Sequence, residues 1–173
     1  GARRENRFLL LIVLIVARAA ESPAPRERVL LDAGWRFALG HATDGSKDFN
    51  HATGGFSYFA KAGFGSGASD PKFDDRGWRT LNLPHDWAVE LPFSERGSGS
   101  HGFKAIGRNF PENSVGWYRK TFRIPKSDLG KRISVEFDGV FRDSIDWVNG
   151  HYLGTEQSGY SSFARNISEI MNY

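Results

Sequence analysis

The sequence predicts an all-β domain, an antiparallel β-sandwich, on three observations. From Val29 onward, short apolar runs alternate with Gly, Pro, Asn and Asp, and no long helical pattern interrupts them. Hydrophobic residues make up 39% and aromatic residues 14% of the chain, which is enough for a packed core and excludes a disordered protein. The length of 173 residues suits one domain and excludes a barrel enzyme of about 250 residues within this chain.

The first half of the chain is expected to hold three short strands and one long surface loop. Val29–Asp32 and Trp35–Leu39 are apolar runs broken at Ala33-Gly34, and Trp78–Leu83 is a third run, ended by a proline. His41–Asp70 is poor in aliphatic residues and rich in Gly and Ser, so we expect a long surface loop there. Its scattered aromatic side chains are Phe49, Phe56, Tyr58, Phe59 and Phe64.

Strand signals are denser in the second half, after a polar, Gly-rich stretch at Glu95–Ser114. Val115–Ile124 is rich in β-branched and aromatic residues and is followed by a proline, which ends it. Arg132–Asp138 alternates polar and apolar residues, a pattern that predicts one buried face and one solvated face.

A hairpin is expected near the end of the chain. Ser144–Val148 is a strand candidate, and Asn149-Gly150 directly after it is typical of a type I′ turn. The return strand begins at Tyr152. Asp143 and Asp146 around this strand are expected on a solvated face rather than as paired catalytic carboxylates.

The first nineteen residues have the pattern of a secretory signal peptide, with a buried core helix as the alternative. Three arginines precede an apolar run from Phe8 to Ala17, and Ala17-Arg18-Ala19 follows as a cleavage site. The run is too short to span a membrane. We therefore expect a signal peptide at 1–19, a linker at 20–28 and one domain at 29–173, secreted or periplasmic and free of the membrane after cleavage. The sequence begins with Gly rather than Met, and it stops at Met171-Asn172-Tyr173 without a terminating pattern. We therefore expect it to be a fragment of a longer protein.

The charge of the chain depends on that segment. The formal net charge is +3 and the pI about 9.3, values that suggest nucleic-acid binding. Loss of residues 1–19 removes four of the 23 basic residues and one of the 20 acidic residues, which leaves 19 of each. No nucleic-acid partner is therefore expected.

Several kinds of site are excluded or weak. The chain has no Cys, and its five His show no metal-ligand spacing, so we expect no metal and no cofactor. Residues 97–102 match G-x-G-x-x-G by letter, but no apolar strand precedes them and no helix follows, so a loop is expected. Asn166-Ile167-Ser168 matches the N-glycosylation sequon.

His85-Asp86 stands between Pro84 and Trp87 and has two interpretations. The carboxylate could accept hydrogen bonds from sugar hydroxyls while Trp87 offers an apolar face to a pyranose ring. Alternatively, His85 and Asp86 satisfy backbone groups at a tight turn and Trp87 fills the core.

Several ordered segments together resemble the N-terminal sugar-binding domain of glycoside hydrolase family 2, which includes the β-galactosidases. Residues 73–87 (FDDRGWRTLNLPHDW) are similar to the family's F-D-D-x-x-W-x-x-L-x-L-P-H-D-W signature, and residues 116–122 (GWYRKTF) to its G-W-Y-R-K-x-F strand. The resemblance continues in order through three further segments: FDGV at 137–140, WVNG at 147–150 with Leu153-Gly154, and GYSSF at 159–163.

The resemblance implies a galactose-binding-like jelly roll at the front of a multidomain hydrolase. Its partners would be a downstream immunoglobulin-like domain and a (β/α)8 barrel that carries both catalytic glutamates, so no catalytic residue is assigned here and this chain alone should be inactive. The loop Ser98–Asn113 and the turn Gln157–Tyr160 match regions that help to close the barrel's sugar pocket. Some β-galactosidases have an aspartate near that turn, where this chain has Ser158.

The candidate contacts for a β-glycoside or oligosaccharide substrate are six side chains: His85, Asp86, His101, Asn109, Ser158 and Tyr160. The expected function is that of a non-catalytic domain of a secreted, β-galactosidase-like hydrolase in carbohydrate metabolism. The alternative is a free-standing exported carbohydrate-binding module without hydrolase activity.

Overall fold

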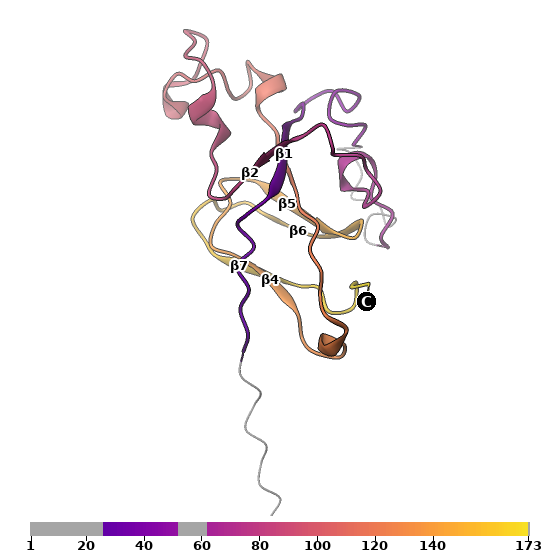
Figure 1. The fold of residues 1–173 in the computed structure, drawn as a ribbon. Coiled ribbons are helices and arrows are strands. Elements are labelled where there is room, and N and C mark those ends of the chain that lie inside the picture. Colours follow the sequence, from indigo (N-terminus) through magenta and orange to yellow (C-terminus); the bar gives the residue numbers. More distant parts are fainter. Residues whose placement is uncertain (1–25, 52–61, 173) are drawn as a thin grey trace, which may run out of the picture. The chain divides into compact units, whose positions relative to one another are not determined.

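The computed structural model describes residues 26–51 and 62–172, which divide between two units, Gly1–Leu31 and Asp32–Tyr173 (Figure 1). Only residues 26–31 of the first unit are described, and they contain no helix or strand. The predicted signal peptide lies outside the described residues. The predicted strand at Val29–Asp32 is wrong, because the backbone of these four residues forms no strand.

The second unit is all-β in its described part, as predicted, and every strand pairing there is antiparallel. Its only helices within residues 32–51 and 62–172 are short 3-10 turns, and none is long and apolar enough to cross a membrane. The strands are β1 (Trp35–Leu39), β2 (Arg79–Leu81), β3 (Gly116–Arg119), β4 (Ser134–Phe137), β5 (Ser144–Val148), β6 (His151–Glu156) and β7 (Phe163–Asn166). The 3-10 turns are η1 (Gly67–Ser69), η2 (Trp87–Glu90), η3 (Gly99–His101), η4 (Pro111–Asn113) and η5 (Lys126–Asp128).

The first sheet has the order β2-β1-β3, so the earliest strand lies in its centre. β1 has the predicted bounds, whereas β2 and β3 are shorter than Trp78–Leu83 and Val115–Ile124. Before β1, the Asn82 side chain accepts a hydrogen bond from Gly34 N at 2.9 Å, which fixes the chain where Gly34 has a φ of +72°.

Two further sheets are pairs of strands, β5-β6 and β4-β7. The predicted hairpin joins β5 to β6: Asn149 and Gly150 have φ values of +51° and +79°, as a type I′ turn requires. In β4 the alternation of exposed and partly buried residues is confirmed. β7 was not predicted as a strand. It pairs with β4 over its whole length, and Phe137 and Phe163 stack with their ring centroids 4.7 Å apart.

Aromatic rings connect the first sheet to the β5-β6 hairpin. Trp117 of β3 stacks on Trp147 of β5, with centroids 5.6 Å apart, and the His51 ring contacts both indoles edge-on. The Trp117 indole N–H donates to the carboxylate of Asp48 at 2.7 Å, and Asp48 is only 1% exposed. This pairing satisfies two polar groups that burial would otherwise leave without partners.

The expectation of a surface loop at His41–Asp70 is therefore wrong in part. Besides Asp48, it supplies Ala68, 1% exposed, to the core cluster, while Phe49 packs on Phe73 and Trp78. The predicted aromatic positions at 56, 58 and 59 lie outside the described residues. A segment low in aliphatic residues can still build a core through aromatic rings, each of which buries a large apolar area.

A buried ion pair connects the two smaller sheets. Arg165 of β7 donates from Nε to the Asp146 carboxylate of β5 at 2.8 Å, and the two side chains are only 18% and 11% exposed. The expectation of a solvated face at Asp146 is wrong, because β7 covers it. Burial raises the pKa of Asp146, an effect larger than the opposing one of Arg165.

Candidate functional site

His85 is largely buried, with a side-chain exposure of 11%, and it is surrounded by partners within the domain. Its Nδ1 lies 2.7 Å from the Tyr118 hydroxyl, and its Nε2 lies 2.9 Å from an Arg79 nitrogen and 3.1 Å from a Glu90 oxygen. The Phe37 ring packs against the imidazole edge, with centroids 4.8 Å apart. Both ring nitrogens of His85 thus have partners within the fold, which favours a structural role, but these partners are side chains and not the backbone groups that the sequence interpretation expected.

The charges around His85 are mutually stabilising. Hydrogen bonds from Arg79 and His85 hold the pKa of Glu90 below its usual value, with Arg79 the larger cause. Burial raises the pKa of Tyr118, so its hydroxyl stays protonated and available as a donor or acceptor. This network fixes the turn after β2 against β3.

Asp86 caps the 3-10 turn η2. Its carboxylate accepts a hydrogen bond from Ala88 N at 2.8 Å, which satisfies a donor at the start of the turn. Trp87 packs near Phe37 and Tyr118 and donates from its indole to the Asn113 carbonyl at 2.9 Å. The Trp87 ring therefore stabilises the domain, and the Asp86 carboxylate remains exposed to solvent.

The next segment, which we call the excursion (residues 91–114), is ordered by many hydrogen bonds and is drawn in pink at the upper left of Figure 1. Phe93 and Lys104 form an isolated antiparallel β-bridge, and Ser94 N donates to the Phe103 carbonyl at 2.8 Å. Arg96 and Asn109 exchange side-chain to backbone bonds of 3.2 and 2.9 Å. The polar, Gly-rich sequence thus folds as an irregular hairpin, and residues 97–102 lie in its tip as a loop, as predicted.

His101 and Asn109 both lie in the excursion, and both are exposed. The His101 ring contacts only the neighbouring Ser100 hydroxyl among the hydrogen bonds found, at 3.2 Å from Nδ1. The Asn109 amide donates to Arg96, so it supports the hairpin as well as facing solvent.

Ser158 and Tyr160 lie in the turn between β6 and β7. The Ser158 hydroxyl contacts that of Ser161 at 3.1 Å and accepts from Tyr160 N at 3.3 Å. Tyr160 is 89% exposed and meets the exposed Phe141 ring edge-on, with centroids 5.5 Å apart. Gly159 packs so closely on Phe141 that a side chain there would overlap the ring. This turn thus presents the Tyr160 ring to solvent beside the exposed Phe141 ring of the β4–β5 connection.

Comparison with known proteins identifies the family to which this chain belongs. A sequence profile for glycosyl hydrolases family 2, sugar binding domain, matches residues 103–172, from the excursion through β7. Over 150 residues the chain is 37% identical to the beta-galactosidase BoGH2A of Bacteroides ovatus, an alignment that covers 87% of this chain. This chain is an N-terminal sugar-binding domain of glycosyl hydrolase family 2.

Other relatives agree on the family but differ in their named sugar. A beta-glucuronidase of Formosa agariphila is 29% identical over 106 residues, covering 61% of this chain and 10% of that protein. The crystal structure of a beta-glycosidase from Bacteroides vulgatus superimposes with a TM-score of 0.60 at 31% identity, over 82% of this chain and 15% of that one. The sugar-binding domain spans only 14% of the length of the Bacteroides ovatus enzyme.

The six predicted residues do not form one cluster. They lie in pairs in three segments of the sugar-binding domain: the turn after β2, the excursion, and the turn between β6 and β7. Sequence reasoning missed Phe93, Phe103 and Phe141, which are 75%, 56% and 58% exposed. A local signal exists only for Phe103, which follows a run of glycine and polar residues at 97–102. Phe93 and Phe141 have apolar neighbours in the sequence, so no local pattern distinguishes them from core residues.

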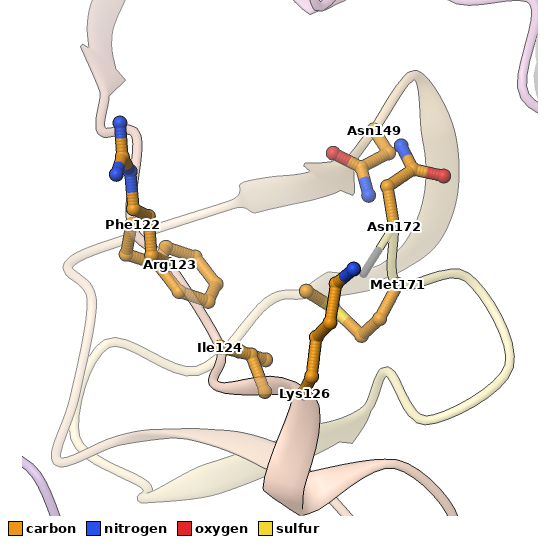
Figure 2. A pocket seen from close by; sticks show the side chains of 7 residues that line it. All are labelled: Phe122, Arg123, Ile124, Lys126, Asn149, Met171 and Asn172. Atoms are coloured by element: carbon orange, nitrogen blue, oxygen red, sulfur yellow. The ribbon is translucent and has the colours of Figure 1, made fainter.

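A cavity of about 460 Å³ lies beside the end of β5 in the sugar-binding domain and contains none of the predicted residues. Figure 2 shows Lys126 and Asn149 projecting toward a shared space, with Met171 and Ile124 as its apolar wall, while the Arg123 guanidinium points away. The Asn149 amide donates to the Ile170 carbonyl at 2.7 Å. That bond secures the last described residues beside the hairpin.

Proposed function

We propose that this domain is the non-catalytic front part of a secreted, β-galactosidase-like glycoside hydrolase, and that it shapes access to a β-glycoside or oligosaccharide substrate. The supporting observation is the match to the Bacteroides ovatus beta-galactosidase over most of this chain but only 14% of that enzyme. The rest of such an enzyme, with an immunoglobulin-like domain and a (β/α)8 barrel, would follow as partner domains of the same protein.

The geometry is consistent with a supporting role rather than with catalysis. The acidic groups near the predicted site are used within the fold: Asp86 caps η2, and Glu90 is bound to Arg79 and His85. The exposed turns, by contrast, present aromatic rings and hydroxyl groups, the combination that packs on sugar rings and bonds their hydroxyls. We further propose that the three small sheets form a jelly-roll sandwich, and that residues 1–19 direct export to the periplasm or outside the cell.

Hydrolysis assays on the whole encoded protein test the proposal. Aryl β-galactoside should be cleaved, with β-glucuronide and β-mannoside as the comparison substrates that define the sugar. If none of the three substrates is cleaved, the proposal is refuted.

The second candidate, a free-standing carbohydrate-binding module, is favoured only by the exposed aromatic turns. Calorimetric titration of the protein with β-linked oligosaccharides separates the two. Binding without any hydrolysis supports the module, whereas hydrolysis supports the enzyme domain.

A further inference from the structure

The chain leaves β3 as a segment that has the sequence of a strand but no partner. The sequence pattern predicts a strand through Ile124, whereas β3 ends at Arg119, which lies opposite Arg36 near the start of β1. Residues 121–124 (TFRI) continue past β1 without a turn or bend. Their backbone makes no hydrogen bond within residues 26–51 and 62–172. Because three of the four residues favour strands, this segment is a strand edge that is open for pairing.

The side chains of this segment alternate between two environments. Thr121 and Arg123 are exposed, whereas Phe122 and Ile124 are partly buried and line the cavity of about 460 Å³ beside β5. Figure 2 shows the Arg123 guanidinium pointing away from that cavity. A period of two is that of a strand with one apolar face. Since the share of liquid volume of one water molecule is about 30 Å³, the cavity has room for several side chains.

The last described residues lie on the wall of the same cavity. Met171 and Asn172 line it, and the Asn149 amide donates to the Ile170 carbonyl at 2.7 Å, which fixes these residues there. The domain spans only 14% of the length of the Bacteroides ovatus enzyme, so the proposed function implies that more polypeptide follows. A segment tethered beside the cavity has an effective concentration in the millimolar range, which a separate protein in dilute solution does not reach.

One charge indicates which kind of segment fits. The Lys126 ammonium projects toward the cavity, and it has no hydrogen bond or ion pair among the described residues. The Asn149 amide across the same space is already bonded to Ile170. A strand that covers Lys126 has to supply an acceptor, because burial of an unpaired charge is costly. A segment with alternating apolar side chains and one carboxylate fits both the apolar wall and the charge.

We propose that the polypeptide beyond residue 173 crosses this cavity as a β-strand. It pairs with the backbone of residues 121–124, packs its apolar side chains on Phe122 and Ile124, and places a carboxylate at Lys126. The inference rests on the proposed function, under which further residues follow, and it goes beyond that function by assigning them the open strand edge. Covering this edge also removes a surface on which other chains could pair.

Amide hydrogen exchange on the whole encoded protein measures the pairing. One added strand bonds every second residue of its neighbour, so alternate amides among residues 121–124 should be protected. We expect them to exchange about a hundredfold or more slowly than in an unfolded chain, because the pairing must open before exchange occurs. Exchange of all four amides at the rate of an unfolded chain would overturn the inference.

A photo-cross-linking side chain identifies the occupant. With p-benzoylphenylalanine in place of Phe122, irradiation of the dilute whole protein should join this position to residues beyond 173 of the same chain. If that variant does not fold, Ile124 takes the probe instead. The same probe in place of Leu129, which is 69% exposed and outside the cavity lining, is the control and should not reach that segment.

Other cross-linking results would refute the proposal. A cross-link to a second copy, recognised by mixing isotopically light and heavy protein, would mean that the cavity is an interface between molecules. A cross-link to residues 1–25 or 52–61 would mean that another part of this chain covers it. The absence of any cross-link, or a reading frame that ends at residue 173, would also overturn the inference.

Two matched charge reversals test the side-chain placement. Lys126→Glu should lower the melting temperature of the whole protein by a few degrees, whereas Arg123→Glu, on the side away from the cavity, should leave it unchanged. Both side chains are exposed in the described part of the chain, so without an added strand neither reversal has a measurable cost. Equal melting temperatures for the two variants would overturn the placement of the strand.

None of these measurements requires hydrolysis, which separates the inference from the proposed function. If the protein cleaves no glycoside but position 122 cross-links to residues beyond 173, the proposed function is refuted and the added strand stands. If an aryl β-galactoside is cleaved but the amides of residues 121–124 exchange freely, the added strand alone is refuted.

Discussion

Replacement of Arg165 by Met should destabilise the domain strongly at neutral pH and much less in mild acid. The change removes the 2.8 Å bond to Asp146 and leaves a carboxylate that is 11% exposed without its ionic partner. Unpaired buried charges cost about 3–5 kcal/mol. The cost has an upper bound, because Asp146 can take up a proton instead. The free-energy cost of keeping Asp146 protonated in the folded state rises by about 1.4 kcal/mol for each pH unit above its unfolded pKa of about 3.9. The largest possible loss of stability is therefore about 4 kcal/mol at pH 7 and about 1.5 kcal/mol at pH 5.

The sign follows from the direction of the pKa shift. Burial already raises the pKa of Asp146 in the wild type, so the folded state binds protons more readily than the unfolded state. Stability from this residue therefore increases as pH falls, and loss of Arg165 enlarges the effect.

Urea unfolding followed by tryptophan fluorescence, at pH 5 and pH 7, measures the difference, and Asp146→Asn added to Arg165→Met should restore most of the lost stability. Arg76→Met is the matched control. It breaks an ion pair to Asp74 with similar distances, but those side chains are 87% and 60% exposed, so the unfolding midpoint should not move. An equal loss at both pH values, or no recovery in the double variant, would refute the reasoning.

Three smaller predictions concern turns and charges near the site. Asp86→Ala removes the cap of η2 and should cost about 1 kcal/mol in unfolding free energy, whereas Asp86→Asn should cost little. Gly150→Ala places a Cβ 2.6 Å from the Gly63 carbonyl oxygen at a φ of +79° and should lower stability by about 1–3 kcal/mol, seen as a lower melting temperature. Because Arg79 and His85 hold the pKa of Glu90 below its model-compound value of 4.5, Glu90 stabilises the fold above that pH and this contribution is lost in acid. Glu90→Gln should therefore flatten the fall of melting temperature below pH 4.5.

Local patterns predicted the strands well where neighbours in sequence are also neighbours in space. β1 and β5 have their predicted bounds, and the Asn149-Gly150 turn has the predicted conformation, because strand propensity and turn chemistry are local properties. The strand at Val29–Asp32 failed because an apolar run becomes a strand only when a partner pairs with it. β7 was missed for the converse reason: its pairing with β4 comes from residues about thirty positions earlier in the chain.

The candidate site was harder to predict, since it depends on contacts between distant residues. The sequence left two roles open for His85 and Asp86, and only the positions of Tyr118 and Arg79 favour the structural one. In the same way, no local pattern distinguishes the solvated Asp143 from Asp146, which lies under Arg165. Burial is a property of the assembled fold, so sequence alone could propose these groups but not assign them.

The central position of β1 in its sheet has a consequence for how the chain is made. β1 pairs with β2, but its other edge is completed only by β3, with Ala38 opposite Trp117. At a synthesis rate of about 5–20 residues per second, the first strand is complete roughly 4–16 s before its second partner exists. During that interval its unpaired edge is free to pair with other chains. The nascent domain is thus most vulnerable to aggregation before residue 119 has been made, and a chaperone that binds the segment around Trp35–Leu39 would protect it at the stage when its own fold cannot.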